Sequence, residues 1–251
     1  MNVDTNTVAC IQARMGSSRL PGKVMLPLDG SHVLEHDIRR VDRADNVDEV
    51  VVATSEKKQD DIIARYAKRE GASIYRGSED DVLRRIYEAA KEHNADVVVR
   101  ATGDNPLVSP DFIDTAIEEL LDSGVDHVSA HLDRTFPCEV TVETFTFESF
   151  SEVESASDQP HQREHVTPYY YENRSDFELH NIRSDDVFDE EYLHNRTDLR
   201  LTLDEADDYE LLRRIYNEIE YDEIVALPEA VQHIDQNELV GINQHVNQKS
   251  I

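Results

Sequence analysis

Short apolar runs alternate with amphipathic segments along the first half of the chain. The apolar runs are rich in β-branched residues and lie at residues 7–12, 49–53, 73–75, 95–100 and 127–130. They predict buried strands, because a parallel sheet is covered on both faces. The amphipathic segments, with apolar residues every three or four positions, lie at residues 34–41, 60–69, 82–93 and 112–121. This alternation predicts a doubly wound α/β fold with a mainly parallel central sheet.

The pattern changes after residue 131. Residues 140–147 alternate between apolar and polar side chains, as an antiparallel or edge strand does. The other expected elements are an aromatic, helical segment at 162–171, strands at 178–182 and 199–203, and helices at 206–219 and 227–234. We interpret residues 1–251 as one domain with an inserted subregion at about 131–195.

Acidic residues dominate the composition. The chain has 54 Asp and Glu against 25 Lys and Arg, and a formal net charge of −29. This charge repels phosphate backbones and anionic lipids, so we expect no nucleic-acid polymer and no membrane as a partner. No apolar run reaches the roughly 18–20 residues that span a bilayer, and the first residues lack the pattern of a secretion signal. Cys10 and Cys138 are too few for a disulfide framework, so we expect a reducing cytoplasm.

Lysine is rare among the basic residues. Only six of the 25 are lysine, and the acids are spread along the whole chain. An acidic, lysine-poor surface is typical of proteins that work in concentrated salt, where counterions screen the self-repulsion. We therefore expect a halophilic protein, with an ordinary acidic cytoplasmic protein as the alternative.

The loop after the first predicted strand differs from the rest of the chain. Residues 5–28 contain no Asp or Glu, while Arg14, Arg19 and Lys23 supply three positive charges. The same loop holds two glycines and two serines, whose backbone N–H groups and hydroxyls suit phosphate oxygens. Loops at the carboxyl ends of strands bind the ligands of open α/β sheets, so we expect a triphosphate here. A basic surface turn is the alternative.

Two carboxylates follow predicted strands. Asp104 comes after residues 95–100, and Asp204 directly after residues 199–203. Mg²⁺ prefers one or two carboxylates together with phosphate oxygens and water, so the pair predicts a metal site beside the first loop. The alternatives are that Asp104 caps a turn and that Asp204 caps a helix.

The first loop also resembles a known family. Residues 13–23, Ala-Arg-Met-Gly-Ser-Ser-Arg-Leu-Pro-Gly-Lys, are similar to the opening of the cytidylyltransferases that activate acidic sugars. These include the CMP-sialic acid and CMP-Kdo synthetases and the branch of the spore coat polysaccharide biosynthesis protein F. The resemblance extends over roughly residues 7–220. Further matching blocks lie at 53–55, 76–78, 81–83, 100–106, 163–168 and 201–204.

The resemblance implies a fold, an activity and a set of site residues. The fold would be that of the nucleotide-diphospho-sugar transferases (GT-A, Rossmann-like). The activity would be Mg²⁺-dependent transfer of CMP from CTP to an acidic sugar, in a homodimer. The implied catalytic residues are Arg14, Lys23 and Asp104, and the implied metal ligands are Asp104 and Asp204. The implied nucleotide-binding residues are Ala13, Arg14, Gly16, Ser17, Lys23, Arg76 and Thr102, and the acceptor-binding residues are Glu143, Arg163 and His165.

Two of these assignments have structural alternatives. Arg76 is equally explained by a surface ion pair with Glu79 or Asp80. His165, expected as a polar contact or a base, is equally explained as a buried, hydrogen-bonded histidine.

The sequence departs from the family mainly in its acceptor half. Glu139 stands where the family usually has Gly, and Thr141 where it has Asp. Leu201 replaces the usual Trp, and Ala206 the usual Pro. The nucleotide half therefore matches better, and the acceptor is the less defined substrate.

Two other functions fit the same fold. A nucleotide-sugar-dependent glycosyltransferase would also use a metal-binding Asp, but the cationic first loop suits a triphosphate better than a diphospho-sugar. A non-catalytic nucleotide- or sugar-binding protein would have no need to keep Arg14, Lys23, Asp104 and Asp204 together.

Overall fold

The apolar runs of the first half form strands of one central sheet. The computed structural model describes residues 5–246. Five of its strands correspond to those runs: β1 (Thr7–Gln12), β4 (Glu49–Ser55), β5 (Ser73–Gly77), β6 (Val97–Thr102) and β7 (His127–Ser129). Two more, β8 (Glu143–Thr146) and β9 (Leu179–Asn181), complete a seven-stranded sheet in the order β5-β4-β1-β6-β8-β7-β9.

Within this described sheet, β8 runs against the other strands. β1 pairs in parallel with β4 and β6, and the pairs β4–β5 and β7–β9 are also parallel. β8 pairs antiparallel with both of its neighbours, β6 and β7. Six strands therefore end at one edge of the sheet, and β8 begins there. The predicted mainly parallel sheet is confirmed, and the alternating segment is an inner antiparallel strand.

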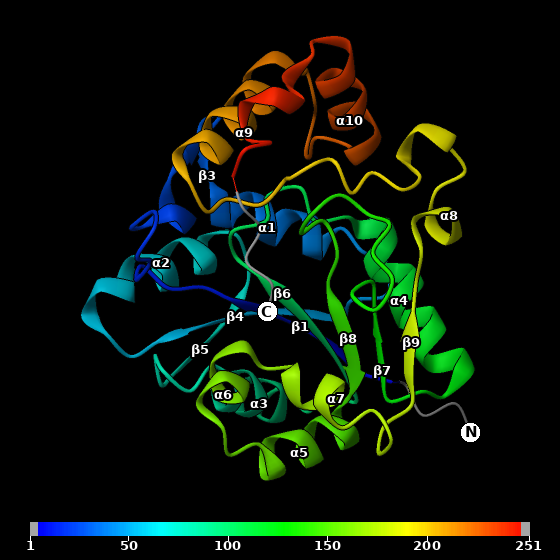
Figure 1. Cartoon of the computed structure of the whole chain (residues 1–251). Helices are drawn as coiled ribbons and strands as arrows, with labels where there is room; N and C mark the ends of the chain where they lie inside the picture. Colours follow the sequence, from blue (N-terminus) through cyan, green and yellow to red (C-terminus); the bar gives the residue numbers. More distant parts are fainter. Residues whose placement is uncertain (1–4, 247–251) are drawn as a thin grey trace.

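Helices cover both faces of the sheet (Figure 1). On β1, Ala9 and Ile11 face one core while Val8 and Cys10 face the other. The first face is covered by α1 (Val33–Asp42), α2 (Asp61–Arg69), α4 (Pro110–Ser123), α9 (Ala206–Glu218) and α10 (Leu227–Gln236). The second face is covered by α3 (Val82–Glu92), α5 (Phe147–Ala156), α6 (Pro160–His165) and α7 (Pro168–Glu172). Apolar side chains on both faces of one strand are what a buried parallel strand requires.

Short elements connect these layers. The hairpin β2 (Pro27–Leu28) and β3 (Ser31–His32) follows the first loop. The remaining short helices are η1 (Lys23–Met25), η2 (Lys58–Asp60), α8 (Ser184–Val187), η3 (Glu191–Leu193) and η4 (Leu239–Ile242).

Two predicted elements are wrong. Residues 199–203 are extended but join no sheet, and their one bridge pairs Arg200 with Cys138. Their leucines are buried, so they show the apolar pattern of a strand without its pairing. Residues 162–171 form parts of two helices instead of one, because Val166 takes a positive φ of 77° and Pro168 starts a new helix.

The expected inserted subregion is joined closely to the rest. Residues 131–195 supply β8 and β9 to the central sheet, and α5, α6 and α7 to the layer on its second face.

No helix within residues 5–246 combines the length and the apolar character needed to cross a membrane.

Candidate active site

A cavity of about 320 Å³ opens at the edge where β1 and β6 end. Seven predicted site residues line it: Ala13, Arg14, Lys23, Thr102, Asp104, His165 and Asp204. Seven further residues complete the lining: Gln12, Arg19, Val82, Arg85, Glu139, Glu164 and Thr202. Larger cavities of about 670 and 640 Å³ lie among the helices of the first face, and their linings contain none of the predicted site residues. The chemistry, more than the volume, therefore identifies the site.

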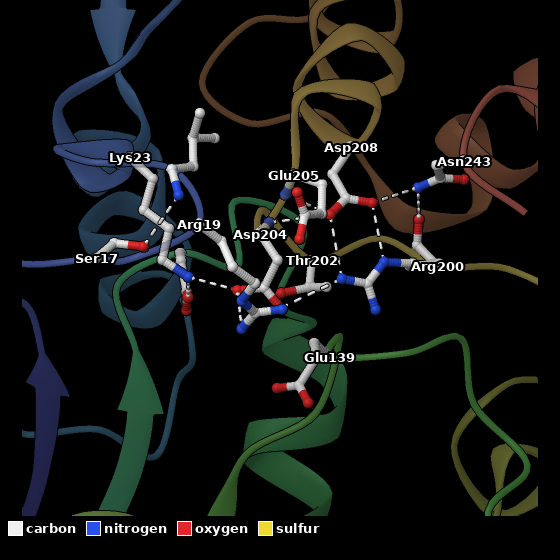
Figure 2. A network of polar contacts seen from close by, with 12 residues as sticks. Ser17, Arg19, Lys23, Glu139, Arg200, Thr202, Asp204, Glu205, Asp208 and Asn243 are labelled. Atoms are coloured by element: carbon white, nitrogen blue, oxygen red, sulfur yellow. Dashed lines mark hydrogen bonds and ion pairs between the residues drawn. The ribbon is translucent and has the colours of Figure 1, made fainter. Parts of the chain in front are cut away.

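The ammonium group of Lys23 lies between the two predicted metal ligands. Its Nζ donates to Oδ2 of Asp104 and, at 2.7 Å, to Oδ1 of Asp204. Arg19 Nη2 reaches the same Asp204 oxygen at 2.7 Å. Figure 2 shows Lys23 and Arg19 approaching Asp204 from the first loop and Arg200 from the opposite side. Three distant segments of the chain thus meet at one cluster of charges.

The cluster sets the charge of its members. Burial by itself raises the pKa of Asp204, but Lys23, Arg19 and Arg200 outweigh it and hold that pKa below the ordinary value. Burial lowers the pKa of Lys23, and Asp104 and Asp204 more than reverse this. The Asp204 carboxylate and the Lys23 ammonium are therefore charged together at neutral pH.

Asp208 fixes the turn that carries Asp204. It is fully buried, and its Oδ2 accepts the backbone N–H groups of Asp204 at 3.0 Å and Glu205 at 2.9 Å. Arg200 donates to both of its oxygens, at 2.9 and 3.1 Å, and Asn243 donates at 2.9 Å. Arg200 also reaches Asp204 at 3.2 Å. Asp208 therefore accepts the backbone N–H groups at the start of α9, and the side chain of Asp204 faces the cavity (Figure 2).

The first loop is held by its own turn and by a buried carboxylate. Asp60 accepts the backbone N–H of Met15 at 2.8 Å. Ser17 Oγ accepts the N–H of Leu20 at 3.2 Å, so this predicted phosphate contact instead closes the loop. Gly22 has a φ of 71°, which places Lys23 at the start of η1. Gly16 and Ser17 are not among the described residues that line the cavity.

The turn after β6 packs against β1. A Cβ on Gly103 would lie 3.1 Å from that of Ala13 and 3.2 Å from the carbonyl oxygen of Gln12, so only glycine fits without a shift. Asn105 donates to Thr102 Oγ1 at 2.5 Å and accepts from Thr202 at 3.0 Å. These contacts tie the carboxyl end of β6 to the segment before Asp204.

Arg85 is a buried cation that the sequence reasoning missed. It is 2% exposed, yet it lines the cavity, and its Nε has no hydrogen-bond partner among the described residues. Burial and the neighbouring Arg14 lower its pKa to about 10. On α3 it occupies a position that periodicity assigns to the surface, so burial alone reveals it. A buried guanidinium with an unused donor suits an anionic ligand.

Arg76 is placed as a structural residue. Its guanidinium donates to the carbonyl oxygens of Ser55 and Lys57, both at 2.8 Å, and to Asp61 at 2.6 Å. It ties β5 to the loop after β4, and the lining found for residues 5–246 does not include it. The expected ion-pair partners Glu79 and Asp80 are replaced by Asp61, and the predicted nucleotide contact stays a prediction.

Glu143 is also structural. It is 2% exposed and receives hydrogen bonds from Arg100 at 2.5 Å, Tyr171 at 2.7 Å and Thr167 at 2.8 Å. Burial by itself raises its pKa, but His127, His131 and Arg100 outweigh it and hold the pKa well below the ordinary value. Glu143 is absent from the described lining, and its predicted acceptor contact stays a prediction. Its carboxylate instead joins β6 and β8 to the start and end of α7.

The other two predicted acceptor residues have different surroundings. Arg163 donates to both oxygens of Asp81, at 2.9 and 2.6 Å, and to Glu154. It ties α6 to the start of α3 and is not among the described residues that line the cavity, so its predicted acceptor contact stays a prediction. His165 is exposed and lines the cavity at the end of α6. The alternative of a buried structural histidine is therefore wrong.

The residues present fit a divalent cation. Oxygens of Asp104 and Asp204 converge on a single ammonium nitrogen, which already shows that both reach one cation. Two carboxylates facing phosphate-binding cations are the donor set that Mg²⁺ or Mn²⁺ takes in protein sites. A cluster of three or more His, Cys, Asp or Glu ligands does not occur within residues 5–246, so ligand or water oxygens would have to complete the coordination.

Known proteins resemble the chain over most of its length. A family described as cytidylyltransferase matches residues 8–241. The uncharacterized protein MJ1063 of Methanocaldococcus jannaschii is 37% identical over 247 residues, which cover 97% of this chain and 96% of that protein. The spore coat polysaccharide biosynthesis protein SpsF of Bacillus subtilis is 32% identical over 210 residues, covering 82% of this chain and 84% of SpsF.

Solved structures share the fold. A cytidylyltransferase from Leptospira borgpetersenii serovar Hardjo-bovis has a TM-score of 0.86 at 30% identity, covering 98% of this chain and 100% of its own. A CMP:2-keto-3-deoxy-manno-octonic acid synthetase complexed with CTP has a TM-score of 0.63 at 16% identity, over 85% of this chain and 99% of its own. The second likeness concerns the fold alone. Together they confirm the predicted nucleotide-diphospho-sugar transferase fold.

We expect Asp208→Asn to lower the free energy of unfolding by about 3 kcal/mol, because it removes the buried charge that pairs with Arg200 and accepts two backbone N–H groups. Urea unfolding at neutral pH measures this. Asp207→Asn, on the next residue but 52% exposed, is the matched control and should change stability by less than about 0.5 kcal/mol. Equal effects of the two changes would contradict the assigned role of Asp208.

Glu143 should make stability depend on pH. Its folded-state pKa lies below the ordinary 4.5, so the ionised carboxylate stabilises the fold above that value. The contribution is lost as the pH falls below 4.5 and through the folded-state pKa. Urea unfolding at a series of pH values should give a flatter acid limb for Glu143→Gln than for the unmodified chain. The same change at exposed Glu152 should leave the limb as it is, and an unchanged limb for Glu143→Gln would refute the prediction.

Proposed function

The chain belongs to the cytidylyltransferase family, and on that premise we propose that it transfers CMP from CTP to an acidic sugar and releases pyrophosphate. The product would be a CMP-sugar for a surface polysaccharide or glycan. The observation that carries the proposal is the cluster of Lys23, Asp104 and Asp204, set in a cavity that four cationic side chains line.

The cationic residues suit the triphosphate. Arg14, Arg19, Lys23 and Arg85 all line the cavity, and they come from the first loop and from α3. Lys23 and Arg19 now use their donors on carboxylates, and with CTP bound they would exchange these partners for phosphate oxygens. Four carboxylates, those of Asp104, Glu139, Glu164 and Asp204, line the same cavity, so its formal charge is balanced. In a chain of net charge −29, such a place repels an anionic nucleotide less than the acidic surface does.

Asp104 and Asp204 would hold Mg²⁺ against the phosphates. When bound, the ion would neutralise the negative charge that builds up at the reacting phosphate. Asp208 and Asn105 keep the two carboxylates at their places by fixing the backbone turns that carry them. Much of the catalytic effect then comes from positioning and charge, as in other phosphoryl transfers.

The reaction itself is a substitution at phosphorus. A hydroxyl oxygen of the acceptor forms a bond to the α-phosphorus of CTP, and the bond from that phosphorus to the bridging oxygen of pyrophosphate breaks. His165 is exposed and lines the cavity, and it would contact the acceptor or take the hydroxyl proton. Lys23 and Arg19 would bind the leaving pyrophosphate. The homodimer, the cytoplasmic location and the halophilic character stay predictions.

A pyrophosphate assay tests the proposal. The protein, in high KCl with Mg²⁺, is incubated with each of the four nucleoside triphosphates and a panel of acidic sugars. We expect pyrophosphate only with CTP. Release of UDP from a UDP-sugar, with no pyrophosphate from any triphosphate, would favour a glycosyltransferase and contradict the proposal. Binding of CTP with no turnover of any acceptor would favour a non-catalytic binding protein.

Asp104→Asn should lower kcat at least about 100-fold, because it removes one of the two carboxylates at the phosphate site. The fold should persist, since Asp204 still pairs with Lys23 and Arg19. Asp122→Asn, an exposed change at the end of α4, is the matched control and should leave kcat as it is. Undiminished turnover by the Asp104 variant would remove this residue from the site.

A further inference from the structure

Glu139 is a charged residue held in a backbone conformation that favours glycine. It lies in the loop between β7 and β8, with a φ of 66°. A side chain in this left-handed region is strained, and such strain persists only where the surroundings enforce it.

Both neighbours of Glu139 are pinned. The backbone of Cys138 donates to the carbonyl oxygen of Leu199 at 2.9 Å and accepts from Leu201 at 3.3 Å. The carbonyl oxygen of Val140 accepts from the N–H of Ser109, at the start of α4, at 2.8 Å. The loop therefore cannot relax to relieve residue 139 without breaking contacts to two other segments.

The carboxylate of Glu139 faces the cavity. It lines the 320 Å³ cavity and is also part of the lining of a smaller one of about 30 Å³ beside it. Asn105 donates to its Oε2 at 3.3 Å, and Asn105 is itself held by Thr102 and Thr202. Figure 2 shows the carboxylate turned away from the Asp204 cluster. It is thus oriented by the protein but does not belong to the Lys23 network.

The smaller cavity contains an unused cation. Arg134 lines it together with His131 and Glu139. Arg134 is exposed and makes no ion pair or hydrogen bond with any residue in the described part of the chain, although acids outnumber bases two to one. Room for roughly one carboxylate-sized group, beside a free guanidinium, suits an anion.

We propose that Glu139 and Arg134 form the acceptor subsite, in which Glu139 accepts a hydrogen bond from a hydroxyl of the acceptor and Arg134 binds its carboxylate. The proposal rests on the proposed function. It replaces Glu143 and Arg163, whose side chains are used within the fold. Glu139 is therefore a specificity-determining residue of the proposed subsite.

Steady-state kinetics with matched acceptors tests the proposal. The probes are 3-deoxy-manno-octulosonate and N-acetylneuraminate, each as the free acid and as the methyl ester, which lacks the charge. Pyrophosphate release gives KM for the acceptor and for CTP separately. We expect Glu139→Gln to raise the acceptor KM at least about tenfold, because a charge-assisted hydrogen bond is lost. KM for CTP should change by less than about twofold, since the nucleotide is bound by the first loop.

Two further variants complete the test. Arg134→Gln should abolish the preference for the free acid over the ester. Glu139→Gly should raise the acceptor KM in the same way and should also raise Tm, because glycine adopts the positive φ without strain. Loss of acceptor binding together with greater stability excludes simple misfolding. Glu148→Gln and Arg65→Gln, both exposed and outside the cavity lining, are the controls and should change neither KM.

The outcomes separate this proposal from the proposed function. CTP binding is measured independently by calorimetry, and failure to bind CTP would overturn both. If the protein binds CTP but releases pyrophosphate from it only when the acceptor is a neutral sugar, the acceptor subsite would be overturned and nucleotidyl transfer would remain in place. An unchanged acceptor KM in Glu139→Gln, or an unchanged acid-to-ester ratio in Arg134→Gln, would also overturn the subsite.

Discussion

The ammonium of Lys23, held between Asp104 and Asp204, is the contact on which the geometry of the site depends. It joins the first loop, the turn after β6 and the turn before α9, which are far apart in the sequence. Two negative charges that approach each other in a low-dielectric cavity require a cation between them. Lys23 provides this cation. Under the proposed function, a divalent ion would take its place between the two carboxylates when Lys23 turns to phosphate. The cluster is therefore assembled by the protein's own residues.

A second layer of contacts supports this cluster. Asp208 and Arg200 form a buried ion pair behind Asp204, and Asp60 holds the first loop from behind Met15. Asp208 accepts the backbone N–H groups of Asp204 and Glu205, and Asp60 accepts that of Met15. Each carboxylate thereby fixes the backbone of a segment whose side chains line the cavity. Positioning of this kind limits the reorganisation that the reaction would otherwise need.

The whole chain is strongly acidic, whereas the lining of the cavity contains both cationic and acidic side chains. Residues 5–28 contain no Asp or Glu, but in the folded chain Asp60, Asp104 and Asp204 from other segments contact them. The type of a charged residue does not reveal whether its partner is a ligand or the protein. Glu143 and Arg163 bind protein groups, while Glu139 faces the cavity.

The sequence alone determined the architecture and the candidate residues that the structure brings together around Lys23. Apolar runs on a parallel strand and cations on a loop are local properties, so the sheet, the loop with Arg14 and Lys23, and the two aspartates were all predicted. Only the tertiary structure decided what depends on contacts between distant segments. Residues 199–203 have the apolar pattern of a strand but join no sheet, because a strand also needs a neighbouring strand with which to pair. Arg85 became a cavity residue because burial, invisible in helical periodicity, placed it there. Arg76, Glu143 and Arg163 became structural because carboxylates, hydroxyls and carbonyl groups from other elements took their hydrogen bonds, and Glu139 faces the cavity because two pinned neighbours hold its backbone at a positive φ.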